Sequence, residues 1–124
     1  MIGEARRDDL APYLGLHYPA SDIPSQARQL YVANPIRLIP DARYRPSPLV
    51  PALAPSTAPL DLSHAVLRSV SPVHLEYLAN MGVRASMSIS LLQGSWLWGL
   101  IACHHQTPHF VPYQTRCACA LETG

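Results

Sequence analysis

The chain has 124 residues, of which 48% are hydrophobic and 14% are charged, a balance that predicts one compact domain and excludes a second, catalytic domain. Nine basic and eight acidic side chains give a net charge of +1, which excludes the broad positive field that nucleic acid or an anionic membrane requires. All nine basic residues are arginine, whose planar fork grips a carboxylate or phosphate at two points.

The three cysteines, Cys103, Cys117 and Cys119, have no metal-type pair spacing, and their odd number argues against a secreted disulfide framework. We therefore expect a reducing, cytoplasmic environment. No stretch approaches the roughly 18 apolar residues of a membrane span, and no signal peptide is recognisable. Neither a membrane nor nucleic acid is an expected partner.

The first regular element is a helix. Ser21 and Asp22 offer N-cap side chains, and an apolar stripe at helical spacing predicts a helix from about Ile23 to Asn34. Residues Ile36 to Ile39 predict a short strand, on which Arg37 points away from its apolar neighbours.

A long loop and two further helices are expected next. Residues Pro40 to Leu60 include six prolines and no apolar period, which predicts an ordered loop of a length that usually accompanies binding. Apolar residues at helical spacing predict a helix over 62–70, whose opposite side would carry a polar ridge of His64, Arg68 and Ser71.

The pair Ser71-Pro72 has the form of a cap followed by a proline, and predicts another helix that ends at Met81-Gly82. Three side chains of this helix would share one face, namely His74, Tyr77 and Met81.

The second half predicts a β-hairpin. Serines alternate with apolar residues from Ser86 to Leu91, and residues 93–95 (QGS) supply a turn into a second strand, Trp96 to His105. A last helix is expected from about Pro112 to Gly124. These elements predict an α+β fold with a mostly antiparallel sheet.

The register of the hairpin decides which histidine joins the serines. An odd number of loop residues places His104 beside them, and an even number places His105 there. We expect His104 to lie beside the serines, on the same face of its strand as Trp96, Trp98, Leu100 and Ala102.

These residues could line a mixed pocket. A row of hydroxyls, a histidine, Arg37 and Arg68 would suit a large, flat, mostly apolar ligand with anionic arms. The simpler alternative, which composition alone favours, is a set of surface arginines on a serine-rich solvent face. A hydrolase lacks a nucleophile elbow, and adjacent residues of a strand, such as His104 and His105, cannot chelate one metal ion together.

Three motifs, in this order, make the sequence specific: residues 18–24 (YPASDIP), 67–78 (LRSVSPVHLEYL) and 97–105 (LWGLIACHH). With them, residues 3–119 resemble the GAF domain of phytochromes, and the biliverdin-binding bacteriophytochromes are the most similar branch. The resemblance implies a GAF domain that is truncated at both ends and spans 1–124, with helices on one side of the sheet and the chromophore on the other.

The resemblance also implies the residues that contact the linear tetrapyrrole. Arg37 and Arg68 would hold the propionates, Asp22 and His74 would share a water near the pyrrole nitrogens, and His104 would bind the carbonyl of the ring that rotates. Three serine hydroxyls would assist the arginines, namely Ser71, Ser86 and Ser88. Ile23 and Pro24 would lie against the rings. Four side chains would enclose the ring that rotates: Tyr18, Tyr31, Tyr77 and Met81.

The function so implied is red and far-red light perception and not enzyme catalysis, with PAS, PHY and histidine-kinase output modules as partners in the full-length family. Bacterial members attach biliverdin through a cysteine of the PAS domain, and plant and cyanobacterial members through a GAF cysteine at the position of Val73. We therefore expect biliverdin to bind this chain non-covalently. The alternative is a truncated GAF scaffold that binds no chromophore and at most forms a homodimer.

Overall fold

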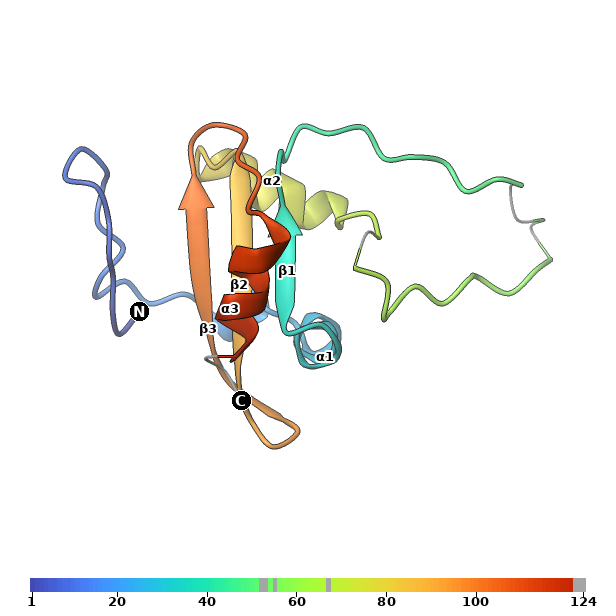
Figure 1. The fold of residues 1–124 in the computed structure, drawn as a ribbon, viewed down its shortest axis with the longest axis horizontal. Coiled ribbons are helices and arrows are strands. Elements are labelled where there is room, and N and C mark those ends of the chain that lie inside the picture. Colours follow the sequence, from blue (N-terminus) through green and yellow to red (C-terminus); the bar gives the residue numbers. More distant parts are fainter. Residues whose placement is uncertain (52–53, 55, 67, 122–124) are drawn as a thin grey trace.

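A three-stranded antiparallel sheet lies at the centre of the molecule (Figure 1). Its strands, in spatial order, are β1 (Ile36–Ile39), β2 (Ala85–Gln93) and β3 (Trp96–His105). The helical elements are the 3-10 turn η1 (Ala20–Asp22), α1 (Ser25–Ala33), α2 (Pro72–Asn80) and α3 (Tyr113–Leu121). This computed structural model describes residues 1–51, 54, 56–66 and 68–121.

The two faces of the sheet differ in chemistry. Arg37 on β1 opposes Ser88 on β2, and Ser86 on β2 opposes His104 on β3. Directly opposed residues of neighbouring strands project to the same side of a sheet. One face, here called the polar face, therefore carries Arg37, Ser86, Ser88, Ser90 and His104. The other, here called the α3 face, carries Leu38, Met87, Ile89, Cys103 and His105.

A β-bulge sets this register. The turn between Gln93 and Trp96 has only two residues, and Gly94 takes a positive φ of 60° there, which glycine tolerates without strain. An even loop alone would place His105, and not His104, on the face of Ser86. The pairing shifts between Leu91 and Leu92, where Trp98 becomes the extra residue of β3.

The prediction that His104 lies beside Ser86 is therefore confirmed, but its stated cause, an odd loop, is wrong. The bulge also breaks the alternation predicted for β3. Trp96 pairs with Gln93 and so falls on the α3 face, not on the face of His104. Regular alternation resumes at Gly99, because from there each residue again opposes one residue of β2.

Helices lie on both faces of the sheet, and not on one as expected. The Ser90 hydroxyl, on the polar face, donates a 2.8 Å hydrogen bond to the Tyr31 carbonyl of α1, and Ile39, also on that face, packs with Leu78 of α2. On the opposite face, the segment that leads into α3 is joined to the end of β1 by the His109 N–H, which donates to the Pro40 carbonyl (2.9 Å), and His109 and Val111 line a hollow together with Leu38 and Met87. Figure 1 shows α3 in front of the sheet and α2 behind it.

The main core lies between α2 and the sheet. Ile39, Leu78 and Val83 form a buried cluster, against which Val70 and Met81 pack. Leu78 is the best buried of these, with 1% of its surface exposed, and burying a leucine contributes about 1.5–3 kcal/mol. Helix α2 ends as its sequence predicts, because Gly82 takes the left-handed conformation (φ 70°) that closes a helix.

The predicted helix over 62–70 is absent from the described residues of that segment, and this expectation was wrong. The Ser63 N–H donates to the Asp61 carboxylate, the Ser63 carbonyl accepts from the Asn34 and Arg68 side chains, and the Val70 N–H donates to the Tyr44 hydroxyl. Side chains that are remote in the sequence thus replace the backbone bonds of a helix. Leu67, which begins one of the three motifs, lies outside the described residues.

The other predicted elements are confirmed with small changes. Strand β1 and strand β3 have the predicted bounds, and the described residues of 40–60 form neither helix nor strand. Helix α1 begins after Pro24 without a side-chain cap, so the cap roles predicted for Ser21 and Asp22 were wrong. These two residues belong instead to the turn η1, which the Asp22 N–H closes by donating to Pro19 (3.0 Å).

The last predicted helix is α3, which ends at Leu121, and residues 122–124 lie outside the described part of the chain. Among the helices that the structure describes, none has both the length and the apolar character needed to cross a bilayer.

Candidate functional site

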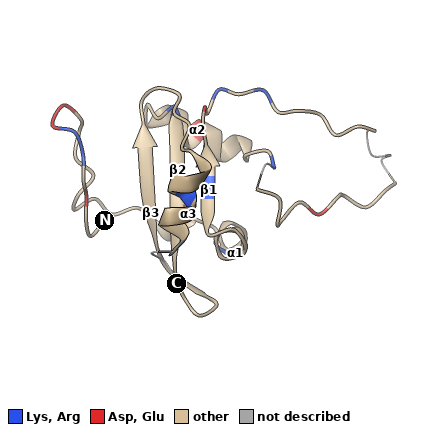
Figure 2. Cartoon of the chain, in the orientation of Figure 1, with Lys and Arg blue, Asp and Glu red and all other residues tan. Residues whose placement is uncertain are grey.

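The polar face brings together residues from four separated segments of the chain. Strand β1 supplies Arg37, the β2–β3 hairpin supplies Ser86, Ser88 and His104, the segment before α2 supplies Arg68, and α2 supplies His74. Strands β2 and β3 carry no Lys, Arg, Asp or Glu, and Figure 2 shows that charges gather in the N-terminal segment and the long loop. Arg37 is therefore the only charged side chain of the described sheet.

Two guanidinium groups lie near each other on this face without a carboxylate. Burial lowers the pKa of Arg37, and the positive charge of Arg68 lowers it further. Arg68 donates from Nη1 to the Ser63 carbonyl (2.7 Å), but its Nη2 is buried and has no hydrogen-bond partner. In the described part of the chain neither arginine forms an ion pair. Two positive charges within electrostatic reach of each other and a buried guanidinium nitrogen without a partner favour an anionic group as the partner.

Two histidines continue the same line of side chains. Burial lowers the pKa of His74, and the charge of Arg37 lowers it further. The pKa of His104 is lowered by burial and then by His74, although the His104 side chain keeps access to solvent. Both imidazoles are therefore held neutral near pH 7, when each can donate one hydrogen bond and accept another.

Asp22 and Tyr77 form the second part of the site. The Tyr77 hydroxyl donates to Oδ2 of Asp22 at 3.3 Å, which joins η1 to α2. Burial raises the pKa of Tyr77, and the negative charges of Asp22 and of ionised Tyr18 and Tyr13 raise it further. The tyrosine therefore stays a hydrogen-bond donor, and Asp22 keeps lone pairs for another donor.

Other predicted site residues lie at the edges of this group. Tyr31 of α1 influences the pKa of Arg37 and so lies within electrostatic reach of it. The Ile23 carbonyl accepts from Arg28 (2.9 Å), and Pro24 and Ser71 flank the starts of α1 and α2. Met81 packs on the core cluster of Ile39, Leu78 and Val83. Within the described residues no hydrogen bond or ion pair links these last four to the site residues Arg37, Arg68, His74 and His104.

Two residues of the N-terminal segment were missed by sequence reasoning. The Tyr13 ring meets the His104 imidazole edge to face, with ring centres 6.4 Å apart and planes at 87°. The Glu4 carboxylate accepts the Tyr13 N–H at 2.7 Å. Neither residue lies in a helix or strand, so no periodicity in the sequence could indicate that they reach the far end of the chain.

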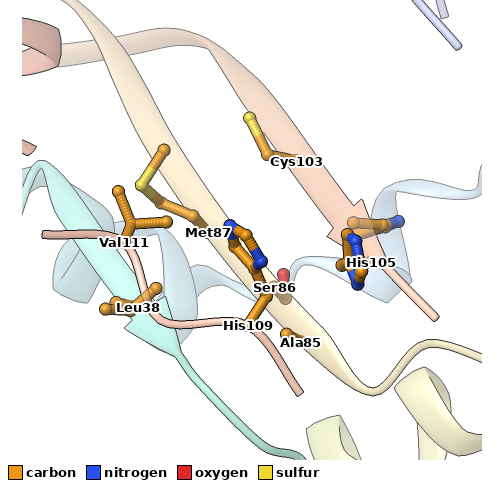
Figure 3. A pocket seen from close by; sticks show the side chains of 9 residues that line it. Leu38, Ala85, Ser86, Met87, Cys103, His105, His109 and Val111 are labelled. Carbon is orange, nitrogen blue, oxygen red and sulfur yellow. The ribbon is translucent and has the colours of Figure 1, made fainter. Parts of the chain in front are cut away.

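A small hollow of about 60 Å³ lies on the opposite side of the sheet (Figure 3). Met87, Cys103, His105 and His109 line it, together with Val111. The rings of His105 and His109 are stacked with their centres 4.8 Å apart. Within the described residues no group of three or more His, Cys, Asp or Glu side chains is placed to hold a metal ion. The hollow is too small for a ligand of several rings.

The fold and the polar face together point to one family, and sequence comparison agrees. A model of the GAF domain family matches residues 5–121. The chain therefore belongs to the GAF domain family, and its similarity to phytochromes, predicted from three motifs, is confirmed by the following relatives.

The chain is 61% identical over 120 residues to cyanobacterial phytochrome B of Nostoc sp., which covers 96% of this chain and 16% of the relative. It is also 61% identical over 117 residues to a bacteriophytochrome of Pseudomonas aeruginosa, with 94% and 16% covered. Among solved structures, the chromophore-binding domain of a bacteriophytochrome from R. palustris matches with a TM-score of 0.87 and 55% identity, over 94% of this chain and 40% of that one. The chain thus spans about one sixth of the length of these curated relatives.

Proposed function

We propose that this chain binds a linear tetrapyrrole, biliverdin, against the polar face, and that it serves as the light-sensing part of a red/far-red photoreceptor. The observation that carries this proposal is the pair of guanidinium groups, Arg37 and Arg68, with a buried Nη2 that lacks a partner. Biliverdin has two propionates on a flat conjugated system, which matches this need for anions. The relatives named phytochrome, and a solved structure titled as a chromophore-binding domain, support the same choice.

The chemistry of the remaining residues fits this ligand. Each arginine can form a two-point, charge-assisted hydrogen bond with one carboxylate, and the neighbouring hydroxyls of Ser86 and Ser88 lie on the same face. When bound, biliverdin would supply absorption of red light and isomerisation of a double bond. Asp22 would accept a hydrogen bond from the protonated pyrrole system, and His74 would hold the shared water near it.

Tyr77 and His104 would respond to the light-driven movement of the end ring. The Tyr77 hydroxyl already donates to Asp22, and a neutral His104 can donate to a ring carbonyl. Exchange of these hydrogen bonds between two arrangements would store part of the energy of the photon in the protein. This role is one of signal transduction and not of catalysis, and it would act through output modules such as PAS, PHY and histidine-kinase domains of a longer protein.

Non-covalent binding is supported by where the thiols lie. Cys103 falls on the α3 face by its pairing with Met87, and Cys117 and Cys119 belong to α3. Val73, at the position of the attachment cysteine in some phytochromes, is 75% exposed. No described cysteine therefore faces the proposed ligand.

The test is to add biliverdin to the purified chain and record its absorption. We expect a red-shifted band near 700 nm and, because attachment is non-covalent, no zinc-enhanced fluorescence after a denaturing gel. Asp22→Ala and His74→Ala should each move deprotonation of the bound pigment toward neutral pH. Failure of the wild-type chain to shift the biliverdin spectrum would favour a scaffold without chromophore, and unchanged absorption of both variants between about pH 6 and 9 would refute the two roles.

A further inference from the structure

The N-terminal segment folds back on itself and ends beside the polar face. The Met1 amino group donates to the Leu16 carbonyl (2.7 Å), and Nη1 of Arg6 donates to the Leu10 carbonyl (3.0 Å). The Leu16 N–H donates to the Tyr13 carbonyl (3.0 Å) around Gly15, whose φ is 81°. These bonds close a loop that contains Tyr13 and has no regular secondary structure.

Glu4 is the anchor of this loop. Its carboxylate accepts the Tyr13 N–H through Oε1 at 2.7 Å, and Oε2 lies 3.7 Å from Nε of Arg6. Only 11% of the Glu4 side chain is exposed, whereas Asp9, in the other ion pair of the segment, is 57% exposed. A charged acceptor that is shielded from water holds its donor more firmly than an exposed one.

This anchor affects the orientation of the His104 imidazole. Tyr13 is held at its N–H by Glu4 and at its carbonyl by Leu16, so its ring stands edge to face with the His104 imidazole. Edge-to-face is a preferred arrangement of aromatic rings, so Tyr13 favours this one orientation of the imidazole. Glu4 has no contact of its own with the polar face in the described residues and can act there only through Tyr13.

We propose that Glu4 is a positioning residue for the chromophore: by holding the Tyr13 main chain, it fixes the orientation of the His104 imidazole toward the end ring of the bound bilin. The part that concerns the bilin depends on the function proposed above. The part that concerns Glu4, Tyr13 and His104 is a property of the chain alone and can be measured without pigment.

The experiment compares four variants of the full chain with wild type: Glu4→Ala, Glu4→Gln, Tyr13→Leu and, as the matched control, Asp9→Asn. Without pigment, NMR records the ring-proton shifts of His104, assigned with His104→Gln. We expect Tyr13→Leu and Glu4→Ala to lose the ring-current shift caused by Tyr13. Glu4→Gln, which keeps an oxygen acceptor, and Asp9→Asn should retain it.

With biliverdin added, the same two variants should show a broadened and blue-shifted long-wavelength band, while Glu4→Gln and Asp9→Asn should keep the wild-type band. If Glu4→Ala does not fold, Glu4→Asp, with a shorter side chain, replaces it and the same losses are expected. A Glu4→Ala protein with wild-type His104 shifts, or with a wild-type bilin spectrum, overturns the inference. If wild type does not bind biliverdin, the proposed function is overturned, and so is the claim that Glu4 orients His104 toward the bilin. The NMR result without pigment still decides whether Glu4 positions His104.

Discussion

The two faces of the sheet are built from alternating residues of the same strands, yet they are completed in different ways. On the α3 face, Leu38 and Met87 line a small hollow together with His109 and Val111 of the same chain, and Met87 is buried. On the polar face, Arg37 and Arg68 approach each other while a buried nitrogen of Arg68 has no partner. Apolar surface is satisfied by packing, but charge and hydrogen-bonding groups require partners. The difference indicates that the α3 face serves stability, as does the part of the polar face that packs on α2, whereas the part that carries Arg37 and Arg68 is suited to a ligand.

Substitutions of the neighbouring residues Met87 and Ser88 should give the largest difference between an effect on stability and an effect on ligand binding. Met87 is 8% exposed on the α3 face, so Met87→Ala should lower the free energy of unfolding by about 2–5 kcal/mol through the cavity it leaves. Ser88→Ala should change it by about 0.5 kcal/mol or less and should weaken biliverdin binding instead. Urea denaturation followed by circular dichroism measures the first effect. Equal losses of stability from both substitutions would contradict the division between the faces.

The arginines should give the next largest effect. A hydrogen bond to a charged group is worth about 1.5–3 kcal/mol, so Arg68→Ala should weaken biliverdin binding by roughly tenfold or more. Arg45→Ala, in the exposed part of the long loop, is the control for a general loss of positive charge and should bind like wild type. Absorption titration measures the dissociation constants of both variants. If both substitutions weaken biliverdin binding equally, the loss is caused by the change in net charge and not by a specific contact of Arg68.

The histidines of the polar face should make stability depend on pH. Because folding lowers the pKa of His74 and His104, chiefly through burial, the unfolded chain binds more protons below its own histidine pKa of about 6.5. The stabilisation from these neutral imidazoles is complete above that pH and is lost as the pH falls toward the lower folded values.

His74→Gln should therefore flatten the decline of unfolding free energy between about pH 6.5 and 5, whereas His17→Gln, at an exposed position of the N-terminal segment, should leave it unchanged. Urea midpoints at a series of pH values provide the measurement. An identical slope in wild type and His74→Gln would show that this imidazole is not held neutral by the fold. The effect is the smallest of those expected here, because solvent still reaches both side chains.

Local signals explain most of what the sequence could predict. The hairpin and α2 follow from period-two alternation and from a proline start with a glycine end, and both are observed. The helix over 62–70 failed because Tyr44 and Asn34, which are distant in the sequence, take over its hydrogen bonds. The bulge at Trp98 could not be foreseen either, since no turn rule indicates an extra residue within a strand.

The sequence predicted the site residues that lie on strands, but not the site contact made by the irregular N-terminal segment. Ser88 and His104 were expected on one face, and the strand pairing confirms that placement. The pairing also puts Arg37, expected only to line the same pocket, on that face. The contact between Tyr13 and His104 was missed because it joins an irregular segment to the last strand. A linear pattern carries no information on such contacts, which depend on how the whole chain packs.

The most direct test of the account compares biliverdin with its dimethyl ester, whose propionates are neutral, in parallel absorption titrations of wild type and Arg68→Ala. If guanidinium groups on the polar face take the propionates, wild type should bind the acid at least about tenfold more tightly than the ester, and the substitution should remove most of that preference. Equal affinity of wild type for the two pigments would contradict the account.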